Sequence, residues 1–441
     1  MRNFRYLFSL IRAFVARFKW VLLAGTVFGL LFFLSLNLFG SNLLQKRKER
    51  IGLVGRYRLD NLPNSVLGYV SSGLTAINEA GEISPAISSS WENQDGGKTW
   101  IFHLGEDYNW QDGKRIISAD IQIKFSDVIV EKPDPKTIVF KLQTTFSPFP
   151  AVLAKPVFRN GFLGTGEWQM KKVTVVGNIV ERIILVKPKE KEMIFKFYPT
   201  EERAKLALKL GEVDKLTDIF SLEPFEAWKN LDIQKRVDEE RFAAIFFNCA
   251  KEKKTSDKTL RQALSYAINK ARFPEKRAIS PLSPNSWAYN PQVKPYLYDL
   301  TKAKEMIKGL SKEIQNNLSL NIATTAVLLP EAEEIAKNWR DLGLEVNVQV
   351  TSGIPENFDT FLAILDIPRD PDQYSLWHSS QSASNIANYQ DPRIDKLLED
   401  GRTVMNESER KKIYLDFQRF LVEDSPAAFL YHPTSYTISR K

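Results

Sequence analysis

Few side chains in this sequence could act as nucleophiles or bind a soft metal ion. The chain has one cysteine, Cys249, so no disulfide can form within it. A thiol nucleophile needs a neighbouring base, and the three histidines, His103, His378 and His432, stand far apart in the sequence. The same counts argue against a zinc site built from cysteine and histidine. We therefore predict a protein that is not an enzyme and holds no cofactor or metal.

The sequence also lacks the short motifs that bind nucleotides or mark common hydrolytic sites. It contains no G-x-x-x-x-G-K-[ST], G-x-G-x-x-G, G-x-S-x-G or H-E-x-x-H pattern. Without these nucleophile and metal constellations, a membrane-anchored hydrolase is a weaker hypothesis than a binding protein.

The positive charge of the chain is concentrated near its N-terminal end. The formal net charge is +8 over 441 residues. Residues 1–50 contain nine basic residues and one acidic residue, which accounts for the whole excess and leaves residues 51–441 neutral. Nucleic-acid-binding proteins carry their excess positive charge on the folded domain that meets the phosphates. We therefore expect no nucleic-acid partner.

A long apolar run follows the first basic residues. Trp20–Phe39 is apolar apart from Thr26, Ser35 and Asn37, and a helix of this length spans a hydrocarbon core of about 30 Å. A cleaved signal peptide and a buried helix are the alternatives, but the run is long for a signal and lacks an A-x-A-like exit. We expect an uncleaved, single-pass anchor in the cell membrane. The basic residues before it favour a globular domain on the extracytoplasmic side, joined by a polar linker at 41–50.

Strand and helix patterns are mixed in the rest of the chain. Residues 88–104 predict a hairpin around an Asp-Gly-Gly turn. The apolar spacing over 260–268 predicts a helix that Asp257 caps and that runs through Asn269. Residues 344–350 alternate as a strand. This mixture predicts an α/β fold with no internal repeat.

Several segments, in order along the chain, resemble the family 5 extracellular solute-binding proteins, the dipeptide- and oligopeptide-binding class. The matching segments are Ser90–Leu104, Trp110–Ile121, Gly164–Gly166, Leu206–Asp214, Phe247–Lys270, Pro281–Asn290, Asp370–Tyr389 and Glu409–Tyr414. The resemblance implies a two-lobed, type II periplasmic-binding-protein-like fold that closes on its ligand about a hinge. It also implies an extra subdomain on the first lobe, which we expect to be reduced because the stretch between Asp120 and Lys136 is short.

The resemblance further implies a division of the chain and a place for the hinge. We expect the hinge strands near Ala244–Asn248 and Phe429–His432. The expected parts are 1–50 for the tail, anchor and linker, 51–247 with the C-terminal strand 426–441 for lobe one, and 248–425 for lobe two.

Candidate ligand-binding residues also come from the resemblance. In peptide-binding relatives, an aspartate just before the Asp-Pro motif receives the amino terminus of the ligand, and a buried ammonium needs such an ionised partner. Asp366 is the nearest match, one residue further from the motif than in the relatives, and Asp370 is the alternative. Relatives bind the peptide main chain by strand addition, for which Phe361–Ile364 is the candidate edge. Either aspartate could instead cap a helix or lie in a loop.

Three further residues are candidates for the wall of a side-chain pocket. They are Trp377, His378 and Tyr389, for which a role in the core is an equally open interpretation.

Together these expectations describe the substrate-binding component of an ABC-type importer. We expect a monomer that captures a peptide or peptide-like solute and delivers it to a permease in the membrane. A sensor or carrier of a non-peptide solute, such as a metal chelate or a sugar, is the alternative on the same fold. A scaffold that binds only a protein partner is a further alternative.

Overall fold

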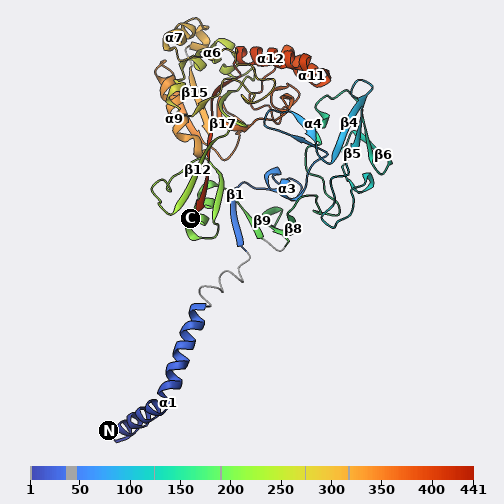
Figure 1. Ribbon diagram of the computed structural model, residues 1–441. Coiled ribbons are helices and arrows are strands. Elements are labelled where there is room, and N and C mark those ends of the chain that lie inside the picture. Colours follow the sequence, from blue (N-terminus) through green and yellow to red (C-terminus); the bar gives the residue numbers. More distant parts are fainter. Residues whose placement is uncertain (1, 36–46, 124, 189–190, 274, 316–317) are drawn as a thin grey trace.

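The computed structural model describes residues 2–35, 47–123, 125–188, 191–273, 275–315 and 318–441. Two sheets with helices packed against them form two lobes, and a smaller sheet lies to one side of them (Figure 1). A long helix lies apart from the lobes on the side where β1 begins (Figure 1). The arrangement confirms the predicted α/β, two-lobed fold with a small extra subdomain.

The sheet of the first lobe has seven strands. Its order is β12 (Leu231–Val237), β19 (Thr434–Arg440), β11 (Lys215–Ile219), β1 (Arg47–Val54), β10 (Lys191–Tyr198), β9 (Ile179–Lys187) and β8 (Gln169–Val176). β1 runs parallel to β10 and β11, and the other neighbours are antiparallel. Helix α5 (Glu201–Leu210) packs against β1, β10 and β11 and ends at Gly211, whose φ of 74° suits a residue without a side chain.

The sheet of the second lobe has six strands. Its order is β14 (Lys276–Arg277), β18 (Ala427–His432), β13 (Arg241–Phe247), β17 (Thr360–Asp366), β15 (Ser319–Thr324) and β16 (Glu345–Val350). The helices of this lobe are α6 (Lys258–Ala267), α7 (Leu300–Lys308), α8 (Lys312–Gln315), α9 (Leu329–Arg340), α10 (Tyr374–Trp377), α11 (Pro392–Thr403) and α12 (Glu407–Asp424). One continuous apolar core joins the central strands to α6, α9, α11 and α12.

Local sequence signals explain where these elements begin. Asp257 caps α6 by accepting a hydrogen bond from the Leu260 amide at 2.9 Å, as predicted, although the helix ends at Ala267 and not at the predicted Asn269. The alternating segment forms β16, as predicted.

The chain crosses between the two sheets twice. Residues 238–240 join β12 to β13, and Pro433 joins β18 to β19. The two crossings touch, since the Asp238 amide donates to the Pro433 carbonyl at 2.8 Å. By sheet membership, the change of lobe therefore falls at 238–240 and Pro433, not at 247 and 426.

The predicted hinge strands lie next to these crossings. Ala244–Asn248 and Phe429–His432 lie almost wholly in the six-stranded sheet, where β13 pairs with β17 along its full length. A buried apolar strand has the same residue pattern in either sheet, so the sequence alone does not show to which sheet these segments belong.

A small antiparallel sheet forms the extra subdomain. Its order is β4 (Ser88–Gln94), β5 (Thr99–Leu104), β7 (Thr137–Leu142) and β6 (Val128–Asp134), and β2 (Thr75–Ile77) pairs with β3 (Ile83–Pro85) beside it. β4 and β5 form the predicted hairpin. The short helices α3 (Asn64–Val70) and α4 (Phe149–Val152) connect this part to the first lobe. Its core is aromatic, with Trp100, Phe102, Phe140 and Phe149 buried together.

Helix α1 (Arg2–Ser35) begins far ahead of the predicted apolar run. By hydropathy, its best candidate for a membrane span is Arg12–Leu31, near the N-terminal end. The predicted span Trp20–Phe39 overlaps this stretch, and its last residues, 36–39, lie outside the described residues.

Candidate functional site

Two adjoining cavities lie where the two sheets meet. One, of about 1100 Å³, is bounded by the ends of β1 and β11 on the first lobe and by β17 and the loop after β15 on the second. The other, of about 1050 Å³, lies between α3, α4, the β2–β3 pair and the segment after β17. Ser65, Asp218 and Arg241 line both cavities, so the two form one cleft. Cavities of this size suit a ligand the size of a short peptide or a large chelate.

Arg241, the first residue of β13, is the centre of the charge in the cleft. Its Nε lies 2.6 Å from an Asp366 oxygen, and its Nη1 lies 3.3 Å from Asp238 and 3.8 Å from Asp218. Its guanidinium also lies over the Phe220 ring, 5.5 Å from the ring centre. Burial lowers the pKa of Arg241, but the Asp366 hydrogen bond and the three carboxylates outweigh it and hold the pKa above its ordinary value.

The three aspartates come from three different parts of the fold. Asp218 belongs to β11 in the first lobe, Asp238 to a crossing segment, and Asp366 to the end of β17 in the second lobe. Burial raises the pKa of Asp238 above its ordinary value. One guanidinium thus faces three carboxyl groups, which leaves the cluster short of positive charge.

Asp218 adopts an uncommon backbone conformation. Its φ is 58°, and it lies where the register between β11 and β19 shifts. A bulge of this kind redirects a side chain out of the regular alternation of the strand. Left-handed non-glycine residues are uncommon and concentrate at functional sites, and aspartate is among the types that tolerate the conformation.

β17 presents an unpaired main-chain edge to the cleft. β13 pairs along the whole of β17, whereas β15 pairs with it only as far as Leu362. The Ile367 amide donates to the Glu240 carbonyl at 2.7 Å on the β13 side. Because main-chain groups alternate sides along a strand, those of Ile364 and Asp366 lie on the opposite side. Within the part of the chain that the structure describes, no strand pairs with that side beyond Leu362.

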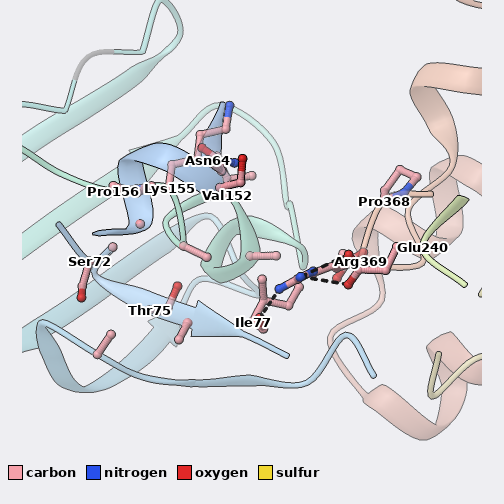
Figure 2. A pocket seen from close by; sticks show the side chains of 18 of the residues that line it. Asn64, Ser72, Thr75, Ile77, Val152, Lys155, Pro156, Glu240, Pro368 and Arg369 are labelled. Carbon is pink, nitrogen blue, oxygen red and sulfur yellow. Dashed lines mark hydrogen bonds and ion pairs between the residues drawn. The ribbon is translucent and has the colours of Figure 1, made fainter. Parts of the chain in front are cut away.

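The second cavity is closed on one side by an arginine that links the lobes. Arg369 donates to the Ile77 carbonyl at 2.9 Å and lies 2.9 Å from a Glu240 oxygen (Figure 2). Figure 2 shows this side chain between the β2 segment and the segment that follows β17. Between Phe146 and Pro148, which line the same cavity, the Ser147 amide donates to the Arg402 carbonyl at 2.7 Å. The subdomain therefore contacts the second lobe as well as the first.

The structure places the six predicted site residues in different environments. Ile364 and Asp366 line the larger cavity. Asp370 lines the smaller one, but its carboxylate is paired with Arg410, with Nη2 and Oδ1 3.1 Å apart. Burial raises the pKa of Asp370, although Arg410 works against this. Asp370 is therefore a structural anion of the second lobe.

The other three predicted residues belong to the core of the second lobe and line neither cavity. Trp377 is 1% exposed and stacks on Phe246, with ring centres 5.9 Å apart. His378 is 6% exposed and stacks on Tyr374. Tyr389 donates its hydroxyl to Asp424 at 2.6 Å. Of the two interpretations of these residues, the geometry favours the core, because each packs or bonds inside the lobe.

Sequence reasoning missed Arg241, Asp218 and Arg369. Arg241 carried a usable signal, since it is a charged residue at the head of an otherwise apolar strand. Asp218 carried no usable sequence signal, because its position in the cleft depends on a bulge between strands that are distant in the sequence.

Comparison with known proteins adds the family. The pattern of the bacterial extracellular solute-binding proteins, family 5, matches residues 121–385, which is more than half of the chain. The chain belongs to this family. Among curated members, the oligopeptide-binding protein AppA of Bacillus subtilis is 22% identical, with 86% of this chain and 84% of that protein aligned.

Solved structures of family 5 proteins agree with the fold. NikZ of Campylobacter jejuni in complex with Ni(L-His) matches with a TM-score of 0.76 at 24% identity, covering 90% of this chain and 95% of that one. AppA of Bacillus subtilis in complex with a nonapeptide matches with a TM-score of 0.69 at 19% identity, covering 90% and 95%. The same two-lobed architecture therefore accommodates both a peptide and a metal chelate in other members.

Proposed function

We propose that this chain is the extracytoplasmic substrate-binding component of an ABC-type importer and that it captures peptides or peptide-like solutes in the cleft between its lobes. The observation that carries the proposal is the unpaired edge of β17 beside the Arg241 cluster. An extended peptide bonds to such an edge through its main chain, whatever its side chains. The binding-protein names of the relatives also favour binding over catalysis.

The charge of the cluster suggests which end of the peptide binds there. Asp366 keeps 83% of its side chain exposed although it is paired with Arg241, so an incoming group reaches it without unfolding anything. The three carboxyl groups exceed the single guanidinium, which favours a cationic ligand group. We assign this position to the ammonium of the ligand, with Asp366 as its first partner and Asp218 on the facing lobe as the second.

Binding at this position would link the two lobes. Asp366 and Asp218 belong to different sheets, and Arg241 lies between them near a crossing. A ligand ammonium held by both would favour the closed arrangement of the lobes over an open one. The division into two lobes that move about the crossings is part of this proposal.

The membrane anchor belongs to the proposal as well. Helix α1 is the only helix among the described residues that is long and apolar enough to cross a bilayer. We propose that it is retained as a single-pass anchor, with the monomeric globular part on the extracytoplasmic side, close to the permease that receives the ligand.

A second candidate ligand is a non-peptide solute such as a metal chelate. The observation in its favour is the match to NikZ in complex with Ni(L-His), at a TM-score of 0.76. A chelate would fill the cavity without needing the β17 edge. Dependence of binding on that edge therefore separates the two ligands.

A titration of the full-length chain in lipid nanodiscs tests the proposal. The chain would be titrated by calorimetry with a pool of random short peptides, with the same peptides acetylated at the amino terminus, and with nickel–histidine. We expect the free peptides to bind, and acetylation or Asp366→Asn to weaken binding by tenfold or more. Asp416→Asn is the matched control, since Asp416 is a half-exposed, arginine-paired aspartate on α12, outside the cleft.

Each outcome decides one point. Binding that is insensitive to acetylation and to Asp366→Asn would keep the importer and remove the ammonium site. Binding of nickel–histidine without binding of peptides would replace the ligand class. Binding of neither would overturn the proposed capture of peptide-like solutes.

A further inference from the structure

Helix α1 consists of two segments with different chemistry. The helix runs from Arg2 to Ser35, but Phe18 has non-helical angles, with φ −110° and ψ 16°. Figure 1 shows the helix bent near its N-terminal end. Bends of this kind need a local cause, and no proline or glycine precedes Phe18 in the helix. The bend coincides with a change in composition along the helix.

The segment before the bend has the pattern of an amphipathic helix. At 100° per residue, one face is formed by positions 4, 7, 8, 11, 14, 15 and 18, all of which are Phe, Leu, Ile or Val. The opposite face holds Arg2, Arg5, Tyr6, Ser9, Ala13 and Ala16, and Arg12 lies between the two faces. Arg17 and Lys19 lie at the two margins. Residues 2–19 carry no acidic residue.

The segment after the bend is apolar on every face. Over 20–35 its polar residues are Thr26 and Ser35, and the Thr26 hydroxyl donates to the Leu22 carbonyl at 2.7 Å, within the helix. Trp20, at the start, is of the type that lies at the membrane–water boundary. A span starting at Arg12 would bury Arg12, Arg17 and Lys19 in hydrocarbon, whereas a span starting at Trp20 leaves all three at the surface.

We infer that residues 2–19 lie flat in the bilayer surface on the N-terminal side, as an interfacial helix that binds anionic lipid, and that only the part after Phe18 spans. Its apolar face enters the boundary between headgroups and acyl chains, and its arginines bind lipid phosphates. At Phe18 the helix bends from the orientation along the bilayer surface to the orientation across the bilayer. The inference rests on the proposed membrane anchor and adds a lipid-binding surface to it.

Depth measurement along the helix tests the inference. Single cysteines would be placed at positions 8, 9, 11, 12 and 27 of the full-length chain in a Cys249→Ser background, and each would be labelled with a nitroxide. The protein would be reconstituted into vesicles of zwitterionic phospholipid mixed with anionic phospholipid, which attracts basic segments. Collision rates with oxygen and with a water-soluble nickel complex give the depth of each label.

We expect positions 8 and 11 to lie about 5–10 Å below the phosphates and positions 9 and 12 to face water, with position 27 near the bilayer centre. Depth that increases steadily from 8 to 12 to 27 would mean that the span begins near Arg12 and would overturn the inference. Water accessibility at all four positions before the bend, with position 27 deep, would overturn it too. If position 27 itself faces water, the proposed anchor fails, which is a separate result.

A charge variant tests the lipid partner. Arg5→Gln combined with Arg12→Gln should raise the nickel accessibility of the labels at 8 and 11 in the mixed vesicles. In vesicles without anionic lipid, the variant and the parent should behave alike. Ser9→Gln is the matched control on the same face, with no change in charge. An equal effect of the arginine changes in both kinds of vesicle would exclude recognition of anionic lipid.

Discussion

The segment 360–389 has two halves that each supply a candidate aspartate and differ in the fold. Its first half, β17, ends in the cleft with Asp366, which keeps 83% of its side chain exposed. Its second half turns inward, where Asp370 is buried against Arg410 and Tyr389 is bonded to Asp424. Both halves supply an aspartate paired with an arginine. The difference lies in solvation, because an exposed pair leaves its carboxylate free to exchange partners and a buried pair does not.

The largest expected change in the free energy of unfolding follows from breaking the buried Asp370–Arg410 pair. Asp370→Ala would leave the Arg410 guanidinium buried without its carboxylate, and we expect the free energy of unfolding to fall by about 3–5 kcal/mol in urea titrations. Replacing the pair with apolar residues, Asp370→Leu with Arg410→Met, should recover much of this loss. A loss below about 1 kcal/mol for Asp370→Ala would show that the two halves do not differ in this way.

A smaller effect is expected at Asp424, which anchors the inner half through Tyr389. The ion pair with Lys258 and the Tyr389 hydrogen bond outweigh burial and hold the pKa of Asp424 below its ordinary value. Such a carboxylate stabilises the fold above its unfolded pKa of about 3.9 and loses this contribution as the pH falls through its folded pKa. Asp424→Asn should therefore cost about 1.5–3 kcal/mol at pH 7.

The pH dependence supplies the control for this variant. The difference in unfolding free energy between Asp424→Asn and the parent should shrink as the pH falls below about 4, where the carboxylate of the unfolded chain takes up a proton, and should be lost below the lower folded pKa. A difference that stays constant from pH 7 to pH 3 would mean that the charge of Asp424 contributes nothing.

Two neighbouring positions on β17 test the main-chain edge. Ala363→Pro removes an amide that faces β13 and should cost about 1–3 kcal/mol of unfolding free energy from the broken ladder. Ile364→Pro removes an amide that faces the cleft and should cost less. In calorimetry, Ile364→Pro should still weaken peptide binding. Equal destabilisation by the two prolines would mean that the Ile364 amide is already bonded within the protein.

The smallest effect on stability is expected at Asp366. Its pair with Arg241 is largely exposed on the aspartate side, so Asp366→Asn should change the free energy of unfolding by at most about 1 kcal/mol. Asp416→Asn should behave similarly in stability and should leave ligand binding unchanged. A loss of several kcal/mol on Asp366→Asn would mean that Asp366 resembles Asp370 and holds the fold together.

Much of the fold could be predicted from local signals. The cap at Asp257, the β4–β5 hairpin and the alternation of β16 depend on neighbours in the sequence, and each was predicted. The sheet that holds β13 and β18 was not, because these are apolar strands that fit either sheet. Pairing partners distant in the sequence decided where they lie.

The site was predicted only in part for the same reason. Asp366 and Ile364 reach the cleft because β17 extends beyond the end of its pairing with β15. Strand pairing determines this extension, and residue composition does not reveal it. Trp377, His378 and Tyr389 have the residue types of a binding pocket, but aromatic and polar side chains of this kind also pack and bond inside a core. Only the three-dimensional arrangement separates the two uses.

The short connection between α1 and β1 has a consequence for transport kinetics. Residues 36–46 can extend to at most about 40 Å between the anchor helix and the first strand. If α1 is retained as the proposed anchor, the domain stays within that distance of the membrane and searches for its permease along the membrane surface. Docking affinity can then be weak and release fast, and the rate of delivery would depend on lateral diffusion in the membrane rather than on the amount of free binding protein.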